Sequence, residues 1–231
     1  MAIPNPILNE IISSKKVEQA DGTHLKLTSA LSLEECEALY RVLRERKPKR
    51  VIEIGMAYGV SGLTILTALE ENGEGTLTSV DPYPGWESAR KAALHNIERA
   101  GLSARHTHIH DASERVLPKL CADGERADFV HIDGHHGFDH AFIDFFYADL
   151  LVNVGGIIAF DDSGWRSVNK VIRYLLRHRK YQELDVGLPR EYRGKNPLVT
   201  LIKRLEGRFG TSRHFEKIDA WAAPFNYHKN F

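Results

Sequence analysis

Residues 51 to 60, Val-Ile-Glu-Ile-Gly-Met-Ala-Tyr-Gly-Val, decide the fold of this chain. They predict a buried strand that runs into a turn with two glycines and then into a helix starting near Val60 to Ser61. Gly55 and Gly59 have no Cβ, so the backbone can turn tightly and lie close to a ligand. The unpaired N–H groups of the helix start would point to the same place. This arrangement indicates a binding site for a nucleoside-containing cofactor.

Two acidic residues refine the kind of cofactor. Asp81 ends a second apolar run and lies 26 residues beyond Gly55, where an acid can accept hydrogen bonds from both ribose hydroxyls. The glycine spacing is Gly-x-x-x-Gly, whereas a dinucleotide diphosphate favours the more open Gly-x-Gly-x-x-Gly. Glu53, two positions before Gly55, would favour a cationic cofactor.

Strand and helix signals alternate along the chain. Five strands are expected, over 51–55, 76–81, 105–110, 127–133 and 155–161. Helices are expected over 60–71, 86–100, 113–122, 138–152 and 165–180. Two further strands, over 181–187 and 198–204, would complete one edge, possibly with an antiparallel strand. The pattern predicts an α/β fold: a Rossmann-like, doubly wound, seven-stranded and mostly parallel sheet with helices on both faces.

Three segments are expected. Residues 1–48 form an N-terminal helical extension, in which Ser32 caps a helix that ends near Lys47. Residues 49–205 form the cofactor-binding core, and 206–231 form an aromatic tail. The tail would complete the core or a subunit interface; a lid over the acceptor site is the alternative.

Composition limits the partners. Lys plus Arg and Asp plus Glu each number 31, so no net charge draws the chain to nucleic acid or membrane. No uncharged run approaches the length of a membrane span, the first residues lack the basic-then-apolar order typical of a signal peptide, and the two cysteines suit reduced thiols. We expect a cytoplasmic protein with a small-molecule partner, and a homo-oligomer stays open. From Arg166 to Lys217 there are 14 Lys or Arg against 5 acids. These basic residues form either solvated helix faces or a rim that receives an anionic substrate.

Carboxylates follow two neighbouring strands. Asp133 ends the fourth expected strand, and Asp161 and Asp162 end the fifth. Strand ends of a parallel sheet share one edge, so these three side chains would lie close together. They would repel one another unless a cation lies between them, and oxygen ligands select Mg²⁺, Ca²⁺ or Mn²⁺. The alternative is that each aspartate caps the helix that follows it.

His135 and His136 come directly after the first of these strand ends. They are solvated turn residues, zinc ligands or a general base. No Cys or Glu stands at a spacing that completes a zinc site. An imidazole near a metal-bound oxygen can accept a proton at neutral pH.

These motifs resemble those of a known family. Residues 53–59 look like the first motif of class I S-adenosylmethionine-dependent methyltransferases, Asp81 resembles their ribose-binding acid, and 110–118 is similar to their adenine segment. The aspartates and histidines at 133–136 and 161–162 resemble the metal-dependent O-methyltransferases of the macrocin and aminocoumarin sugar type, and more distantly the catechol type. The resemblance covers about residues 35 to 205.

The resemblance implies roles for single residues. Asp133, Asp161 and Asp162 would hold Mg²⁺ or another hard divalent cation. His136 would be the base, with His135 the less favoured candidate. The cofactor-binding residues implied are Glu53, Gly55, Met56, Ala57, Tyr58, Gly59, Ser61, Asp81, Asp111, Ala112, Ser113 and Asp133. Met56, Ala57 and Tyr58 are bulkier than the small-residue turn of many methyltransferases.

The expected activity is Mg²⁺-dependent methyl transfer from S-adenosylmethionine to a hydroxyl of a sugar diol or catechol-like acceptor. Two other classes remain open. An NAD(P)-dependent oxidoreductase would share the sheet and the ribose acid, but it does not explain the clustered aspartates. A non-catalytic cofactor-binding protein would bind S-adenosylhomocysteine without turnover.

Overall fold

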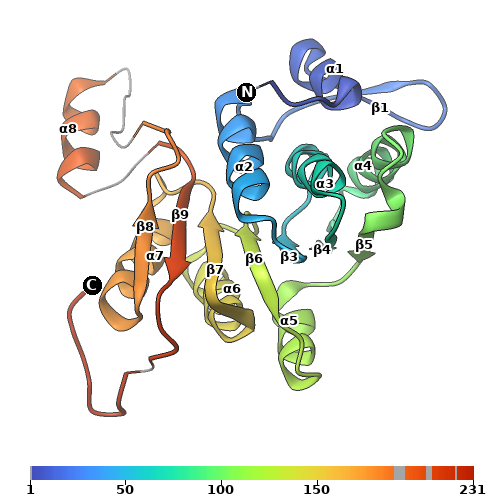
Figure 1. The fold of residues 1–231 in the computed structure, drawn as a ribbon. Coiled ribbons are helices and arrows are strands. Elements are labelled where there is room, and N and C mark those ends of the chain that lie inside the picture. The colour runs from blue at the N-terminus through green and yellow to red at the C-terminus, as the bar shows by residue number, and fades with distance from the viewer. Residues whose placement is uncertain (1, 190–195, 207–209, 222) are drawn as a thin grey trace. The chain divides into compact units, whose positions relative to one another are not determined.

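The computed structural model describes residues 2–189, 196–206, 210–221 and 223–231. The chain divides into two compact units, one up to Val116 and one from Leu117 onward. The strands have the order β5-β4-β3-β6-β7-β9-β8 in a seven-stranded sheet, which confirms the predicted α/β fold (Figure 1). None of the described helices is both long and apolar enough to cross a membrane.

The first unit begins with two helices and a hairpin, followed by a βαβαβ segment. Its first elements are α1 (Pro6–Ser14), β1 (Lys16–Glu18), β2 (His24–Lys26) and α2 (Leu33–Arg46). The segment that follows contains β3 (Arg50–Ile54), α3 (Val60–Asn72), β4 (Thr76–Val80), α4 (Glu87–Arg99), the short 3₁₀ helix η1 (Ser103–Arg105) and β5 (His106–Ile109). Ser32 caps α2 as expected, in a reciprocal capping box with Glu35.

Parallel pairing sets the register of the first unit. β3 pairs with β4 so that Ile54 lies opposite Val80, and β4 pairs with β5. The residues that follow β3 and β4 therefore emerge side by side. This places the glycine turn next to Asp81.

The second unit contains the remaining strands. After α5 (Ser113–Ala122), which crosses from the first unit, come β6 (Ala127–Ile132), α6 (Phe138–Leu151), β7 (Val152–Phe160), α7 (Arg166–His178), β8 (Tyr181–Leu184), α8 (Pro197–Leu205) and β9 (Arg213–Lys217). β6 and β7 are parallel, whereas β9 is antiparallel to both β7 and β8. Phe145 of α6 contacts Phe160 of β7, which contacts Phe215 of β9, so aromatic rings join the helix layer to the strands.

The strand expected over 198–204 is wrong. Residues 198–204, expected as a strand, lie in the helix α8. The side chain of Asn196 caps this helix and Pro197 occupies its first turn, a start signal that outweighs the strand propensity of Val199, Thr200 and Ile202. The last strand is β9 instead, so the sheet extends beyond residue 205 to Lys217.

The C-terminal tail contacts α7 of its own unit. The Tyr227 hydroxyl donates to the Arg177 carbonyl oxygen at 3.0 Å, and the Phe231 ring lies edge-on to Tyr174 with centroids 5.1 Å apart. Between the strands expected over 181–187 and 198–204, residues 190–195 lie outside the described residues, as does Phe209 of the tail.

Two buried histidines lie on one face of the strands in the second unit. His131 of β6 and His214 of β9 are both register partners of Ala159, and each is 1% exposed. Neither ring nitrogen of His214 has a hydrogen-bond partner among the described residues. Burial lowers the pKa of His214 to about 3, because a charged imidazole would be poorly solvated there.

We predict that His214→Leu makes the protein less sensitive to acid. The unfolded chain takes up a proton near pH 6.5 and the folded chain near pH 3, so folding stability falls as the pH drops below 6.5. That loss reaches about 3 kcal/mol at pH 4 and should disappear in the variant. Urea unfolding at several pH values measures it, with the exposed His24→Leu as control. An unchanged pH slope in the His214 variant would contradict the prediction.

Candidate cofactor and metal sites

The turn after β3 has the backbone that its glycines predict. Gly55 has φ 86° and Gly59, the N-cap of α3, has φ 80°. A Cβ added at Gly59 would lie 3.0 Å from the Cβ of Ala93 in α4. Ala57 also has a positive φ, 43°, which costs energy in a residue other than glycine. The turn is thus held in one conformation, with the helix N-terminus at its end.

Asp81 holds this turn through backbone hydrogen bonds. Its Oδ2 accepts from the N–H groups of Met56 at 2.8 Å and Ala57 at 3.1 Å. Its Oδ1 accepts from the Tyr83 N–H at 2.8 Å. A carboxylate offers about four lone-pair sites, so these three bonds leave capacity for a ribose hydroxyl.

Glu53 lies buried beneath the same turn. Its Oε2 accepts a hydrogen bond from the Ser79 hydroxyl at 2.6 Å, and the carboxylate lies against the first turn of α3, 3.4 Å from where a Cβ on Gly62 would stand. Burial raises the pKa of Glu53 to about 7, while hydrogen bonds from Ser61 and Ser79 oppose that rise. A positive charge near the turn would therefore stabilise the ionised form.

The segment after β5 begins α5. Asp111 Oδ1 accepts from the Ala112 N–H at 2.8 Å and from Arg115 Nε at 2.6 Å. The helix starts at the next residue, Ser113. The adenine role expected for Asp111, Ala112 and Ser113 stays a prediction.

A second group of candidate site residues follows β6 and β7. His136 Nε2 lies 3.1 Å from Asp162 Oδ2 and 3.6 Å from Asp133 Oδ1. One ligand atom from each of these three residues lies within 4.8 Å of the others. Asp162 has φ 50°, a strained value at the point where its carboxylate reaches the imidazole.

Asp161 is placed differently from the other two aspartates. Its backbone N–H donates to the Ile132 carbonyl oxygen at 3.0 Å, which extends the pairing of β6 and β7 by one residue. It does not belong to the group formed by Asp133, His136 and Asp162. The structure thus brings together two of the three aspartates expected to bind metal, and adds a histidine.

The adjacent histidines have different surroundings. The His136 ring stacks on Trp165 with centroids 5.7 Å apart and an angle of 28°, and the His136 carbonyl oxygen accepts from the Ser167 hydroxyl. His135 is exposed, and its Nδ1 accepts from the Gly137 N–H at 3.0 Å. Trp165 was not among the residues selected from the sequence, although it stands three positions after Asp162.

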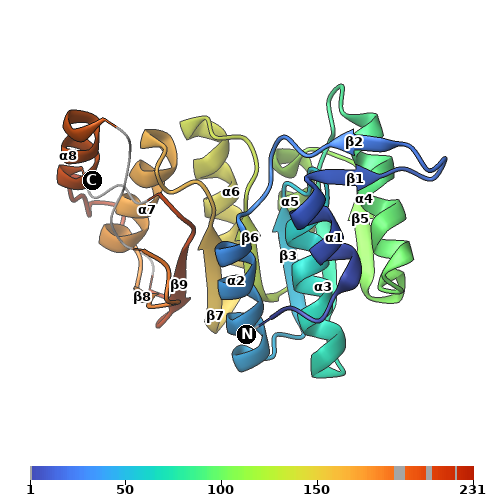
Figure 2. The same ribbon diagram turned by 90° about the horizontal axis from the view of Figure 1, so that it is seen from above.

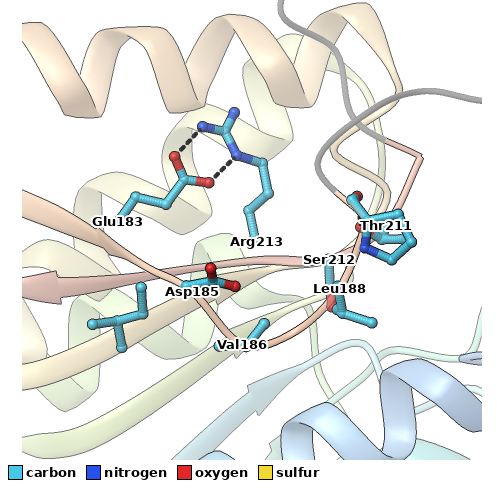
Figure 3. Close-up of a pocket in the computed structure, with 9 residues that line it drawn as sticks. Glu183, Asp185, Val186, Leu188, Thr211, Ser212 and Arg213 are labelled. Atoms are coloured by element: carbon cyan, nitrogen blue, oxygen red, sulfur yellow. Dashed lines mark hydrogen bonds and ion pairs between the residues drawn. The ribbon is translucent and has the colours of Figure 1, made fainter.

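A small pocket between β8, the loop after it and β9 is no acceptor site. Figure 3 shows Arg213 forked onto Glu183, with distances of 2.7 and 2.8 Å. The space beside this ion pair is about 10 Å³, which is room for about one water molecule.

We predict that Glu53→Gln changes the pH dependence of stability. The pKa of Glu53 is higher in the folded chain, about 7, than its ordinary 4.5. Stability therefore falls as the pH rises through this window, by about 3 kcal/mol between pH 4.5 and 8. The neutral amide removes this loss, so the variant should gain stability relative to the parent as the pH rises. Denaturant titrations test it, with the exposed Glu98→Gln as control; parallel profiles would refute the assignment.

The comparisons with known proteins agree with this geometry. Residues 52–163 match a family model described as a methyltransferase domain. Caffeoyl-CoA O-methyltransferase from Stellaria longipes is 27% identical over 158 residues, covering 65% of this chain and 61% of its own length. Flavonoid 3',5'-methyltransferase from Vitis vinifera is 29% identical over 157 residues, covering 65% and 63%. The chain thus spans less than two thirds of the length of these relatives.

Solved structures show the same fold. The O-methyltransferase from Bacillus cereus in complex with S-adenosylhomocysteine is 18% identical with a TM-score of 0.63, and the match covers 91% of this chain and 90% of that one. The O-methyltransferase TomG from Streptomyces achromogenes, in complex with S-adenosylmethionine, is 19% identical with a TM-score of 0.61, covering 81% and 82%. These likenesses are of fold, and the matched residues 52–163 include the glycine turn, Asp81 and the group of Asp133, His136 and Asp162.

Proposed function

We propose that the protein is an S-adenosylmethionine-dependent, divalent-metal-dependent O-methyltransferase for a small molecule with two adjacent hydroxyl groups. The observation that supports both the metal and the reaction is the group of Asp133, His136 and Asp162, which follows two adjacent parallel strands. Carboxylate oxygens and a nearby imidazole are suited both to a cation and to proton transfer.

The first unit fits the cofactor. S-adenosylmethionine supplies an electrophilic methyl group and carries a sulfonium charge. The strained glycine turn leaves the backbone open to close approach, and Asp81 retains acceptor capacity for the ribose. Buried Glu53, with its pKa near 7, would ionise more readily beside a cationic ligand. The cofactor roles expected for Met56, Tyr58, Ser61 and Asp111 to Ser113 are part of this proposal.

The second unit fits a hard divalent cation. Asp133 and Asp162 offer carboxylate oxygens at neighbouring strand ends, and Asp161 is the third ligand that the sequence motif suggests. When bound, Mg²⁺ would stabilise the deprotonated form of an acceptor hydroxyl. Asp133 was also expected to touch the cofactor, a role that stays with the proposal.

His136 is the proposed general base. Asp162 Oδ2, 3.1 Å from His136 Nε2, would stabilise the cation that forms when the ring takes up a proton. Stacking on Trp165 fixes the plane of the ring. His135 lacks both contacts in the described part of the chain, so it is the weaker candidate.

The proposed acceptor is a catechol-like phenol or a sugar diol. Adjacent hydroxyls chelate a cation with good geometry, which also aligns one oxygen for attack. The names of the relatives, caffeoyl-CoA and flavonoid methyltransferases, favour the phenol. Trp165, 55% exposed beside His136, offers a flat surface on which an aromatic acceptor would stack. A cytoplasmic location, in keeping with two free cysteines, is part of the proposal.

The oxidoreductase alternative is less well supported. Its glycine loop is absent, and the relatives named here are methyltransferases. It also leaves the group of Asp133, His136 and Asp162 without a role. A non-catalytic cofactor-binding protein would likewise have no use for this group.

Removing the cation ligands should abolish methyl transfer. With labelled S-adenosylmethionine and either catechol or a sugar diol, we expect EDTA or Asp162→Ala to lower turnover at least about 100-fold. Mn²⁺ binding, followed by electron paramagnetic resonance, should weaken in parallel, while S-adenosylhomocysteine binding persists. The exposed Asp123→Ala is the control. Full activity in EDTA would rule out the metal.

Replacing the base should separate chemistry from binding. His136→Gln is expected to lower kcat about 10²- to 10⁴-fold, the range for a lost general base, with S-adenosylhomocysteine affinity unchanged in calorimetry. His135→Gln is the matched control and should retain most activity. The proposal fails if His135→Gln is the inactive variant, or if His136→Gln turns over normally.

A further inference from the structure

We infer that α8 docks the protein on the surface of an anionic lipid bilayer. Five apolar side chains of this nine-residue helix face solvent, and none of its residues is buried. Leu198 and Leu205 are 66% and 80% exposed. Figures 1 and 2 show α8 at the edge of the second unit, away from its strands. Such a surface is costly in water unless something covers it.

The apolar residues form one continuous stripe. At about 100° per residue, Leu201, Leu205, Leu198, Ile202 and Val199 follow one another across an arc of about 160°. Thr200 lies on the opposite side, and Pro197 lies at one edge of the stripe, next to Leu201. A short helix with this division lies in the plane of a membrane interface and buries its stripe among the acyl chains.

Charge indicates which surface would receive the stripe. Lys203 and Arg204 flank the stripe, one on each side. The chain from Arg166 to Lys217 holds 14 Lys or Arg against 5 acids, and four of these cations, Arg166, Arg179, Arg213 and Lys217, are in ion pairs. Basic side chains beside an apolar stripe favour anionic phospholipid headgroups, because the charges attract while the leucines insert.

A second copy of the chain is a poorer fit. A nine-residue helix is about 14 Å long, and its stripe covers on the order of 200 Å². A specific protein interface buries about 800 Å² per partner. A bilayer needs no matching patch of that size, because it receives each side chain separately.

The helix is tied to its unit at its C-terminal end. Glu206, the residue after α8, accepts from Arg166 at 3.1 Å. Arg166 is the first residue of α7 and follows Trp165, which stacks on His136. A docked α8 would thus hold this part of the unit near the lipid surface. We expected no membrane partner because the net charge is zero and no run is long enough to span a bilayer; neither property bears on a short helix with basic residues that lies on the surface.

Vesicle flotation of the full chain tests the inference. Vesicles of phosphatidylcholine alone are compared with vesicles containing an equal part of phosphatidylglycerol. We expect binding to the anionic vesicles, weakened by salt. Leu201→Gln should weaken it about tenfold or more, whereas Thr200→Gln, on the polar side, should not. Lys203→Gln and Arg204→Gln should each weaken it about fivefold.

The controls separate the outcomes. Leu201→Gln should keep the Tm of the parent, since Leu201 is 53% exposed. Thr200→Gln loses the bond from its hydroxyl to the Asn196 carbonyl oxygen, so the Tm of every variant is measured alongside flotation. No flotation with either vesicle, or equal flotation of Leu201→Gln and the parent, overturns the inference. So does a dimer in sedimentation velocity that Leu201→Gln dissociates without vesicle binding, because the stripe would then receive a second copy. The assay needs no methyl acceptor, so its result is independent of the proposed reaction.

Discussion

The rest of this structure depends on one constraint, the register of the parallel strands, which makes neighbouring strands end at the same level. In the first unit Ile54 lies opposite Val80, so the glycine turn and Asp81 follow at the same level. In the second unit Ile132 lies opposite Phe160, so Asp133 and the Asp161-Asp162 pair follow together. If a strand shifted its pairing register by one residue, its side chains would change faces of the sheet and the acid that follows it would be displaced. Apolar residues that fill both faces of the strands fix the register, and the register brings the functional groups together.

The functional segments contain the strained and polar positions that the core avoids. Ala57, Tyr83 and Asp162 have positive φ without being glycine. Glu53 is fully buried, with a raised pKa. Such features reduce stability, and the surrounding helices must compensate. Among the described residues other than glycine, the remaining positive φ values belong to Lys15 and Lys47, which end helices, so the other three lie at the strand ends on which the proposed function depends.

The sequence was most informative where local pattern and tertiary role agree. The strand before Gly55, the helix from Val60 and the capping of α2 by Ser32 all appear as expected. It failed at residues 198–204, where an apolar run rich in β-branched residues folds as α8. An apolar run of this kind can form either a strand or a helix. Here Asn196 and Pro197, which are typical of a helix start, favour the helix. β9 was missed because His214 and Arg213 interrupt its apolar pattern, although both are buried in the fold.

The sequence by itself determined the fold class, the glycine turn and the set of acids and histidines from which the proposed site is built, because glycine spacing and strand periodicity are local properties. Only the tertiary structure decided which of them meet. It separated His136 from His135, grouped Asp162 with Asp133 and left Asp161 outside, and added Trp165. These distinctions depend on backbone dihedral angles and on contacts between residues distant in sequence, such as the positive φ of Asp162 and the stacking of Trp165. The type of a residue does not reveal which residues it contacts, and those contacts determine its chemistry.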